Sequence, residues 1–250
     1  MIFVPVRDGV RLPRAVLLDL DDTILDDSRN VSSCWRASCF AHAAALGELD
    51  PSLLFQEIER TRDWYWADPE RHRLGRLRLA DARRDVVSLS LSKLGLDRSD
   101  VADAIAAHYQ SARDIGIAPL EGAIETVRWL RDRGCRLALL TNGDGRAQRA
   151  KVDRFALGPL FDEILIEGEL GYGKPDPRVY EQALERLETP SDDAWMVGDN
   201  LEWDVVAPQR LGVFGIWIDT YGRGVPTGLP QPPGRVIRLL SELRQRDGAR

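Results

Sequence analysis

The sequence predicts an α/β protein in which a parallel sheet is covered by helices and a helical segment interrupts the order of strands. Three observations support this prediction. Short, continuous apolar runs recur along the chain, and such runs are typical of strands buried on both faces. Segments with a helical period separate most of these runs, as expected for strands that pair in parallel. After the first run, about 90 residues lack a convincing strand.

The predicted strands are short, and most of them end at a polar or glycine-containing turn. They comprise residues 15–18, 137–140, 164–166, 195–197 and 213–218, with a short edge strand at 236–237. The helices predicted around them comprise residues 120–133, 146–155, 177–187 and 202–211, with a closing helix at 239–246. Four Gly and four Pro within residues 222–234 predict a loop before the edge strand.

The segment without strands, residues 27–116, is rich in Ala, Leu, Arg and Glu and predicts an insert of four helices. Its helical candidates are residues 32–46, 51–66, 79–94 and 99–115. We therefore expect two domains: an α/β core formed by residues 1–26 and 117–250, and a smaller helical domain that interrupts it.

Composition narrows the possible functions. The 250 residues carry 34 basic and 40 acidic side chains, and this net charge of −6 disfavours binding to nucleic-acid polymers or anionic membranes. No apolar run approaches the roughly 18–20 residues of a membrane span, and the first residues lack the features of a secretion signal. The three cysteines form no C-x-x-C pair. These features predict a cytoplasmic protein with reduced thiols.

Two aspartates directly follow the first predicted strand. Asp19 and Asp21 are two residues apart, a spacing that places side chains on the same face of a strand. Converging carboxylates repel each other and need a cation or a shared proton, and Mg²⁺ prefers oxygen ligands of this kind. An Asx turn or a helix cap would also explain an Asp-rich turn. Taken alone, the two aspartates leave both interpretations open.

Three further strands also end in polar groups. Thr141 and Asn142 follow the second strand, Lys174 follows the third, and Asp199 follows the fourth, with Asp204 five residues later. In open parallel sheets, ligands bind outside the carboxyl ends of the strands. Lysine is also rare, because 31 of the 34 basic residues are arginine. A lysine at this position indicates a site that needs a compact positive charge.

These residues resemble the motifs of the haloacid dehalogenase-like (HAD) hydrolase superfamily across nearly the whole chain. The resemblance rests on D-x-D-x-T (Asp19, Asp21 and Thr23), a strand-terminal Thr, the Lys of G-K-P, and G-D-x-x-x-x-D. It implies a Rossmann-like core with helices on both faces of the sheet. The position and helical content of the insert are similar to the C1-type cap of subfamily I.

The resemblance also implies catalytic roles. Asp19 would be the nucleophile that becomes an aspartyl-phosphate, and Asp21 would be the general acid and base. Thr141, together with the backbone N–H of Asn142, would bind phosphoryl oxygens. Lys174 would neutralise negative charge on the nucleophile and on the transferring group.

The same resemblance implies a Mg²⁺ site. Asp19, the main-chain carbonyl of Asp21 and Asp199 would hold the ion, with Asp204 in its coordination shell or next to it. Basic, aromatic residues 60–84 of the cap, among them Trp66, Arg73 and Arg76, would contact the non-phosphate part of the substrate. A solvated helix face whose arginines pair with the cap's own acids explains that stretch equally simply, and we favour it.

The predicted function is Mg²⁺-dependent hydrolysis of a small phosphorylated metabolite, a phosphomonoester. Asp21 favours a phosphatase, because dehalogenases of the superfamily lack this second Asp and transport ATPases carry Thr there. Three alternatives stay open: a phosphotransferase or phosphomutase, a haloacid dehalogenase, and a catalytically silent regulatory member. The sequence fits either a monomer or a homodimer and does not specify the substrate.

Overall fold

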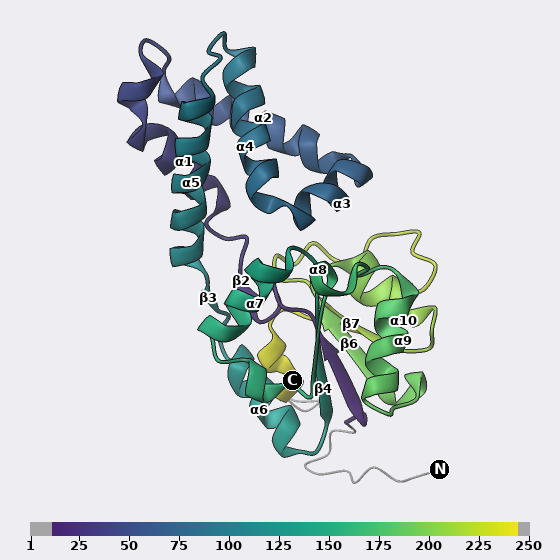
Figure 1. Cartoon of the computed structure of the whole chain (residues 1–250). Coiled ribbons are helices and arrows are strands. Elements are labelled where there is room, and N and C mark those ends of the chain that lie inside the picture. The colour runs from purple at the N-terminus through teal and green to yellow at the C-terminus, as the bar shows by residue number, and fades with distance from the viewer. Residues whose placement is uncertain (1–11, 245–250) are drawn as a thin grey trace. The chain divides into compact units, whose positions relative to one another are not determined.

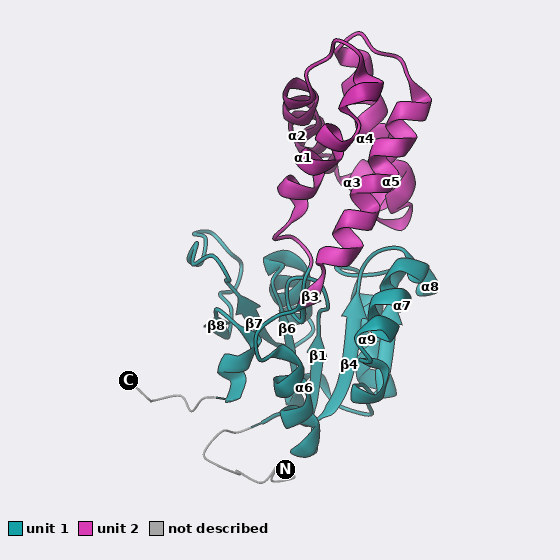
Figure 2. Ribbon diagram, turned by 90° about the vertical axis from the view of Figure 1, so that its left-hand side faces the viewer, with its two compact units in different colours: residues 1–26, 119–250 teal, residues 27–118 magenta. Residues whose placement is uncertain are grey.

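We describe the protein from a computed structural model, whose described part is residues 12–244. Two parts of the predictions lie outside this range: the first residues of the chain, which lack the features of a secretion signal, and residues 245–246 at the end of the predicted closing helix. Contacts divide the chain into two compact units, one formed up to Asp26 and from Pro119 onwards, the other spanning Asp27–Ala118 (Figure 2). That these units fold as separate domains with the boundaries expected above stays a prediction.

The first unit is built on a parallel sheet, as predicted (Figure 1). Within residues 12–244 it has six strands in the order β5-β4-β1-β6-β7-β8. Their bounds are Glu163–Ile166, Arg136–Thr141, Ala15–Leu18, Ala194–Gly198, Phe214–Ile218 and Arg235–Ile237, in that order. In register, Leu18 at the end of β1 pairs with Leu139 of β4 and Val197 of β6. The carboxyl ends of these central strands therefore meet at one edge.

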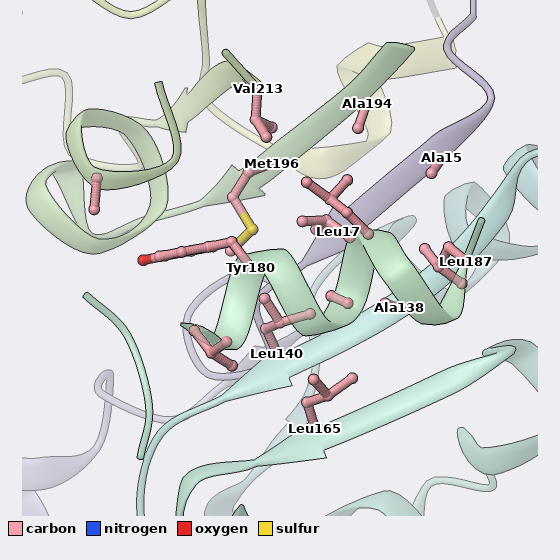
Figure 3. Packing of buried hydrophobic residues seen from close by; sticks show 14 residues of the cluster. Ala15, Leu17, Ala138, Leu140, Leu165, Tyr180, Leu187, Ala194, Met196 and Val213 are labelled. Carbon is pink, nitrogen blue, oxygen red and sulfur yellow. The ribbon is translucent and has the colours of Figure 1, made fainter. Parts of the chain in front are cut away.

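One face of the sheet is covered by helix α9 (Pro177–Arg186) and the short helix α10 (Ala207–Gln209). Asp176 caps α9 by accepting a hydrogen bond from the N–H of Arg178, and Pro177 occupies the first turn. The buried side of α9 packs against alternate residues of the strands, such as Leu17 and Leu140 (Figure 3). The intervening strand residues point to the other face and are also buried, which explains the continuous apolar runs.

The remaining helical segments of the first unit are α6 (Ala123–Asp132), α7 (Gly145–Arg154), α8 (Glu167–Leu170) and several short turns. The short turns are η2 (Gly158–Leu160), η3 (Ser191–Asp193), the π-helical η4 (Leu201–Val206) and η5 (Leu240–Arg244). The helix predicted over residues 202–211 is present as one continuous helical run, but it begins as the π-helical η4 and becomes α-helical only in α10, which ends at Gln209. Pro208 lies within α10 and has no N–H to donate, so the backbone hydrogen bond that a regular α-helix would make at this residue is missing. Residues 222–234 form the predicted loop.

The second unit is helical. Its elements are α1 (Val31–Ala41), η1 (Ala43–Leu46), α2 (Pro51–Ala67), α3 (Pro69–Leu77), α4 (Leu79–Lys93) and α5 (Ser99–Gly116). Residues 27–118 are all described, and they contain five α-helices where four were predicted. The prediction missed α3 because its sequence is almost entirely polar and lacks an apolar stripe. Its capping signal was readable, since Asp68 accepts a hydrogen bond from the N–H of Arg71 and Pro69 follows it.

Two very short strands, β2 (Leu25–Asp26) and β3 (Ala118–Pro119), pair where the chain leaves and re-enters the first unit. None of the helices in the described part of the chain is both long and apolar enough to cross a membrane.

Candidate active site

The candidate site begins at the turn after β1. The N–H of Asp19 donates to the carbonyl oxygen of Val197 at 3.0 Å, which continues the pairing of β1 with β6 by one residue. Beyond Asp19 the chain turns sharply: the N–H groups of Ile24 and Leu25 both donate to the carbonyl of Leu20. Asp22 has a φ of 59°, a region that Asp tolerates better than most residues. The Asp-rich turn therefore closes while the Asp19 side chain stays buried.

Lys174 joins two buried carboxylates. Its Nζ lies 2.6 Å from Oδ1 of Asp19 and 2.7 Å from Oδ1 of Asp204, and its side chain is 2% exposed. Burial alone would lower the pKa of Lys174, but the charges of Asp19 and Asp204 outweigh it and raise the pKa. The lysine is therefore a fixed positive charge between two aspartates, which is the role that the sequence suggested for a compact cation.

The loop that carries Lys174 is held by Asn142. The side-chain amide of Asn142 donates to the carbonyl of Lys174 at 2.6 Å, and the N–H of Lys174 donates to Oδ1 of Asn142 at 2.8 Å. A Cβ on Gly173 would lie 2.5 Å from the same Oδ1, so only glycine fits there. The motifs predicted a function only for the backbone N–H of Asn142, and this function of its side chain was not predicted.

The spacing of G-D-x-x-x-x-D also has a structural reason. Asp204 lies in η4, and its Oδ2 accepts a hydrogen bond from the N–H of Asn200 at 3.0 Å. A Cβ on Gly198 would lie 2.2 Å from that oxygen. Glycine at the end of β6 therefore lets the Asp204 carboxylate approach the strand closely enough to reach Lys174.

Three carboxylates converge at this edge of the sheet. Asp19, Asp199 and Asp204 each offer an oxygen within 4.8 Å of the others. Burial, and then the charge of Asp204, raise the pKa of Asp19 to about 6 although Lys174 opposes them. Burial and the charges of Asp19 and Asp204 raise the pKa of Asp199 to about 8. Negative charge thus exceeds what one ammonium compensates, and this set of hard oxygen donors fits a divalent cation such as Mg²⁺.

The carboxylate of Asp21 is held by helix α7 instead. Its Oδ1 lies 2.7 Å from Nζ of Lys151, and its Oδ2 accepts a hydrogen bond from Nε2 of Gln148 at 2.8 Å. Nε2 of Gln148 also lies within hydrogen-bonding distance of Oγ1 of Thr141, the last residue of β4, and of the Asn142 carbonyl. Neither Gln148 nor Lys151 was predicted as a site residue. The rarity of lysine in this chain could have singled out Lys151, but it was applied only to Lys174.

The cap residues expected to contact substrate all have partners within the helical unit. Arg73 makes a two-bond ion pair with Glu70, at 3.0 and 2.8 Å. Nη1 of Arg76 lies 3.1 Å from Nδ1 of His72, and the ring of Trp66 contacts the ring of the same histidine edge-on. The exposed Arg73–Glu70 pair has the form expected of arginines that pair with the cap's own acids, whereas the half-buried Arg76 and Trp66 contact a histidine. A role of these three residues in substrate binding stays a prediction.

With this geometry in place, comparison with known proteins identifies the family. Residues 13–212 match the family model of haloacid dehalogenase-like hydrolases. The chain belongs to this family of enzymes. The resemblance found in the four motifs is confirmed, and so are the parallel α/β core and the helical insertion between β1 and β4, which is consistent with the C1 cap of subfamily I. We therefore call residues 27–118 the cap.

Two relatives of this HAD hydrolase have known activities. A glyceraldehyde 3-phosphate phosphatase of Methanopyrus kandleri is 29% identical over 209 residues, which cover 82% of this chain and 83% of the relative. A phosphoserine phosphatase of Thermus thermophilus is 45% identical over 89 residues, which are 36% of each chain. Both are phosphatases of small phosphorylated molecules.

Among solved structures, YfnB of Bacillus subtilis bound to magnesium superposes with a TM-score of 0.72. It is 21% identical, and the match covers 94% of this chain and 98% of that one. At this level of identity the comparison supports the fold.

Proposed function

We propose that this HAD hydrolase is a Mg²⁺-dependent phosphatase that hydrolyses a small phosphomonoester through an aspartyl-phosphate on Asp19. One observation carries the proposal: the carboxylates of Asp19 and Asp21, which follow β1, contact different partners. Asp19 contacts the fixed charge of Lys174, whereas Asp21 is linked through Gln148 to the hydroxyl of Thr141. The residues proposed as nucleophile, acid-base group and phosphate-binding hydroxyl thus follow or end the neighbouring strands β1 and β4, at one edge of the sheet.

Charge at this site suits a phosphoryl group. Asp19, Asp199 and Asp204, together with the main-chain carbonyl of Asp21, would hold Mg²⁺. When bound, the ion supplies positive charge that offsets the charge of the carboxylates and of the phosphate oxygens. Thr141 and the N–H of Asn142 would bind phosphoryl oxygens, and Lys174 would keep its positive charge beside the reacting carboxylate.

The reaction proceeds in two displacements. A carboxylate oxygen of Asp19 attacks phosphorus, the bond from phosphorus to the leaving oxygen breaks, and Asp21 gives its proton to that oxygen. Water then attacks the same phosphorus, Asp21 takes one proton from the water, and the bond to Asp19 breaks to release inorganic phosphate. Asp21 ends in the protonated form in which it began, so each turnover consumes one water and regenerates both aspartates.

The substrate class proposed is a small phosphorylated metabolite. Support comes from the two relatives, which are named as phosphatases of glyceraldehyde 3-phosphate and of phosphoserine. Asp21 also distinguishes this chain from dehalogenases, which have no leaving alkoxide to protonate. Trp66, Arg73 and Arg76 remain the cap positions at which we would look for contacts with the non-phosphate part.

The test is phosphate release from a panel of phosphorylated metabolites with and without Mg²⁺. We expect turnover that requires Mg²⁺, needs no added acceptor and is lost in Asp19→Asn. The exposed Asp192 provides a matched control. It lies outside the site, so Asp192→Asn makes the same chemical change there and should leave turnover intact. Phosphate transfer only when an alcohol acceptor is present would instead indicate a phosphotransferase. Unchanged turnover in Asp19→Asn would refute the assignment of the nucleophile.

A further inference from the structure

Helix α7 reaches both oxygens of the Asp21 carboxylate. Lys151 contacts Oδ1 at 2.7 Å and Gln148 contacts Oδ2 at 2.8 Å, and the two residues are three apart on the helix. Side chains at this spacing lie on the same helix face. Asp144 caps the N-terminus of the helix and stabilises its first turn by accepting a hydrogen bond from the N–H of Ala147. The orientation of the Asp21 carboxylate is therefore set by side chains of helix α7, not by the turn after β1 in which Asp21 lies.

Gln148 connects Asp21 to the phosphate-binding position. Its Nε2 also lies within hydrogen-bonding distance of Oγ1 of Thr141, and the Gln148 side chain is almost completely buried. A buried amide between two polar groups fixes the distance between them, because moving either one would leave a donor unsatisfied. The acid-base group and the group that binds phosphate are thus held as one unit.

The chain's use of lysine supports a specific function for Lys151. Among three lysines in a chain with 31 arginines, Lys174 contacts Asp19 and Lys151 contacts Asp21. The third, Lys93, contacts Glu57 in the cap. Both lysines of the first unit therefore lie against the two aspartates of the D-x-D motif. At each aspartate a compact ammonium can contact a single carboxylate oxygen, whereas the planar guanidinium of an arginine is suited to contact both oxygens.

We propose that Gln148 and Lys151 are positioning residues that orient the Asp21 carboxylate for proton transfer to the leaving group. This inference rests on the proposed phosphatase function. Each carboxylate oxygen has a second lone pair, so the two contacts leave room for the proton that Asp21 transfers. Neither residue needs to touch the substrate, and their effect should therefore depend on how much the leaving group needs a proton.

Leaving groups of different acidity separate this role from a general structural one. The alkoxide of an alkyl phosphate is a strong base and needs the proton from Asp21, whereas the phenolate of an activated aryl phosphate departs without it. For Lys151→Met and Gln148→Met we expect kcat on an alkyl phosphate to fall about tenfold or more while kcat on the aryl phosphate changes little. For Lys151→Met the KM values should stay close to those of the wild type, because the phosphate-binding groups and their contact with Gln148 are retained.

Arg149 provides a matched control on the same helix. It forms an exposed ion pair with Glu169, so Arg149→Met removes a cation from α7 without affecting Asp21. The control should keep the wild-type ratio of alkyl to aryl turnover. Equal losses on both substrates in the Lys151 and Gln148 variants would overturn the proposal and indicate a structural role. A raised KM with an unchanged ratio in Lys151→Met would also overturn it, because that result indicates direct contact of Lys151 with phosphate.

A second readout does not need activity. Unfolding by urea, measured for Lys151→Met, Asp21→Ala and the double variant, should show non-additive effects if the two side chains interact in solution. Additive effects would overturn the proposal even if the enzyme proves to be a phosphatase. Conversely, absence of phosphatase activity in the wild type, with non-additive unfolding, would refute the proposed function and show that only the Lys151–Asp21 contact is correct.

Discussion

The core and the cap place their charged side chains in different ways. In the core, the ion pairs of the candidate site join distant parts of the sequence, since Lys174 is 155 residues from Asp19 and Lys151 is 130 residues from Asp21. In the cap, several arginines pair with an acid three residues earlier on the same helix, as Arg73 does with Glu70. Distant pairs form only when the fold is complete, whereas local pairs require only a helix.

Burial differs in the same way between these examples, although the cap also has one long-range pair, Arg113 with Asp27, whose arginine side chain is buried. The side chain of Lys174 is 2% exposed, whereas that of Arg73 is 52% exposed. Exposed pairs contribute roughly 0–1 kcal/mol, but removing one member of a buried pair leaves an uncompensated charge. We infer that the charges at the sheet edge serve the chemistry of the site, while those on the cap helices mainly serve the helices.

The largest effect should come from breaking the buried pair. Lys174→Met leaves the carboxylates of Asp19 and Asp204 without their cation, so we expect a loss of about 3 kcal/mol in the free energy of unfolding without Mg²⁺, and loss of turnover. Urea unfolding monitored by circular dichroism measures the first. Arg73→Met removes an exposed cation from the cap and should change stability by less than about 0.5 kcal/mol. Similar losses in the two variants would contradict the comparison.

Close packing at the end of β6 gives the next effect. In Gly198→Ala the new methyl group would collide with Oδ2 of Asp204, so we expect about 1–3 kcal/mol of destabilisation and weaker Mg²⁺ binding. Calorimetric titration with Mg²⁺ checks the affinity. Gly158→Ala is the matched control, because nothing lies within 4 Å of a Cβ there. If Gly198→Ala bound Mg²⁺ as tightly as the wild type, Asp204 would have no part in the metal site.

The pH dependence of Mg²⁺ binding should be intermediate in size. The pKa of Asp199 is raised from 3.8 to about 8, so the folded, metal-free protein holds this proton more tightly than the unfolded chain does. Stability without metal should therefore fall as pH rises from about 4 to about 8. Mg²⁺ displaces the proton, so the increase in melting temperature on adding Mg²⁺ should grow over the same interval. A pH-independent increase would contradict this linkage.

The smallest effect concerns the cap. If the arginines of the cap are paired and solvated, Arg73→Ala and Arg76→Ala should leave the melting temperature unchanged within experimental error. Their kcat and KM should stay within about twofold of the wild-type values. Steady-state kinetics on the best substrate of the panel measures this. A clearly raised KM in a variant that remains folded would show that these arginines contact the substrate, and would break the division between core and cap.

The parts of the structure with a strong local signal were predictable. The six strands of the parallel sheet were located to within about one residue at each end, because buried parallel strands are continuous apolar runs, whereas the two-residue strands β2 and β3 were not predicted. Helix α3 was missed because a polar helix has no periodic apolar face, although its capping aspartate and proline were present. The π-helical start of the helix predicted over residues 202–211 was missed because Pro208, which lacks an N–H, was not weighed against the helical period.

The candidate site was predictable in its residues but not in its connections. The order of motifs identified Asp19, Asp21, Lys174 and Asp204 as neighbours at one edge of the sheet. Side-chain partners that come from another helix have no spacing rule, which is why the contacts of Gln148 and Lys151 with Asp21 could not be derived. The reciprocal hydrogen bonds of Asn142 with the Lys174 backbone depend on loop geometry that one sequence does not specify.

The most direct test of the central claim is to look for phosphate covalently bound to Asp19 during turnover. Enzyme mixed with a radiolabelled phosphomonoester and Mg²⁺ should, on acid quenching within the first turnover, retain label that hydroxylamine releases, as expected for an acyl phosphate. Peptide mapping should place the label on the peptide containing Asp19, and Asp19→Asn should retain none. Rapid phosphate release without any bound label, or label at another residue, would contradict the account.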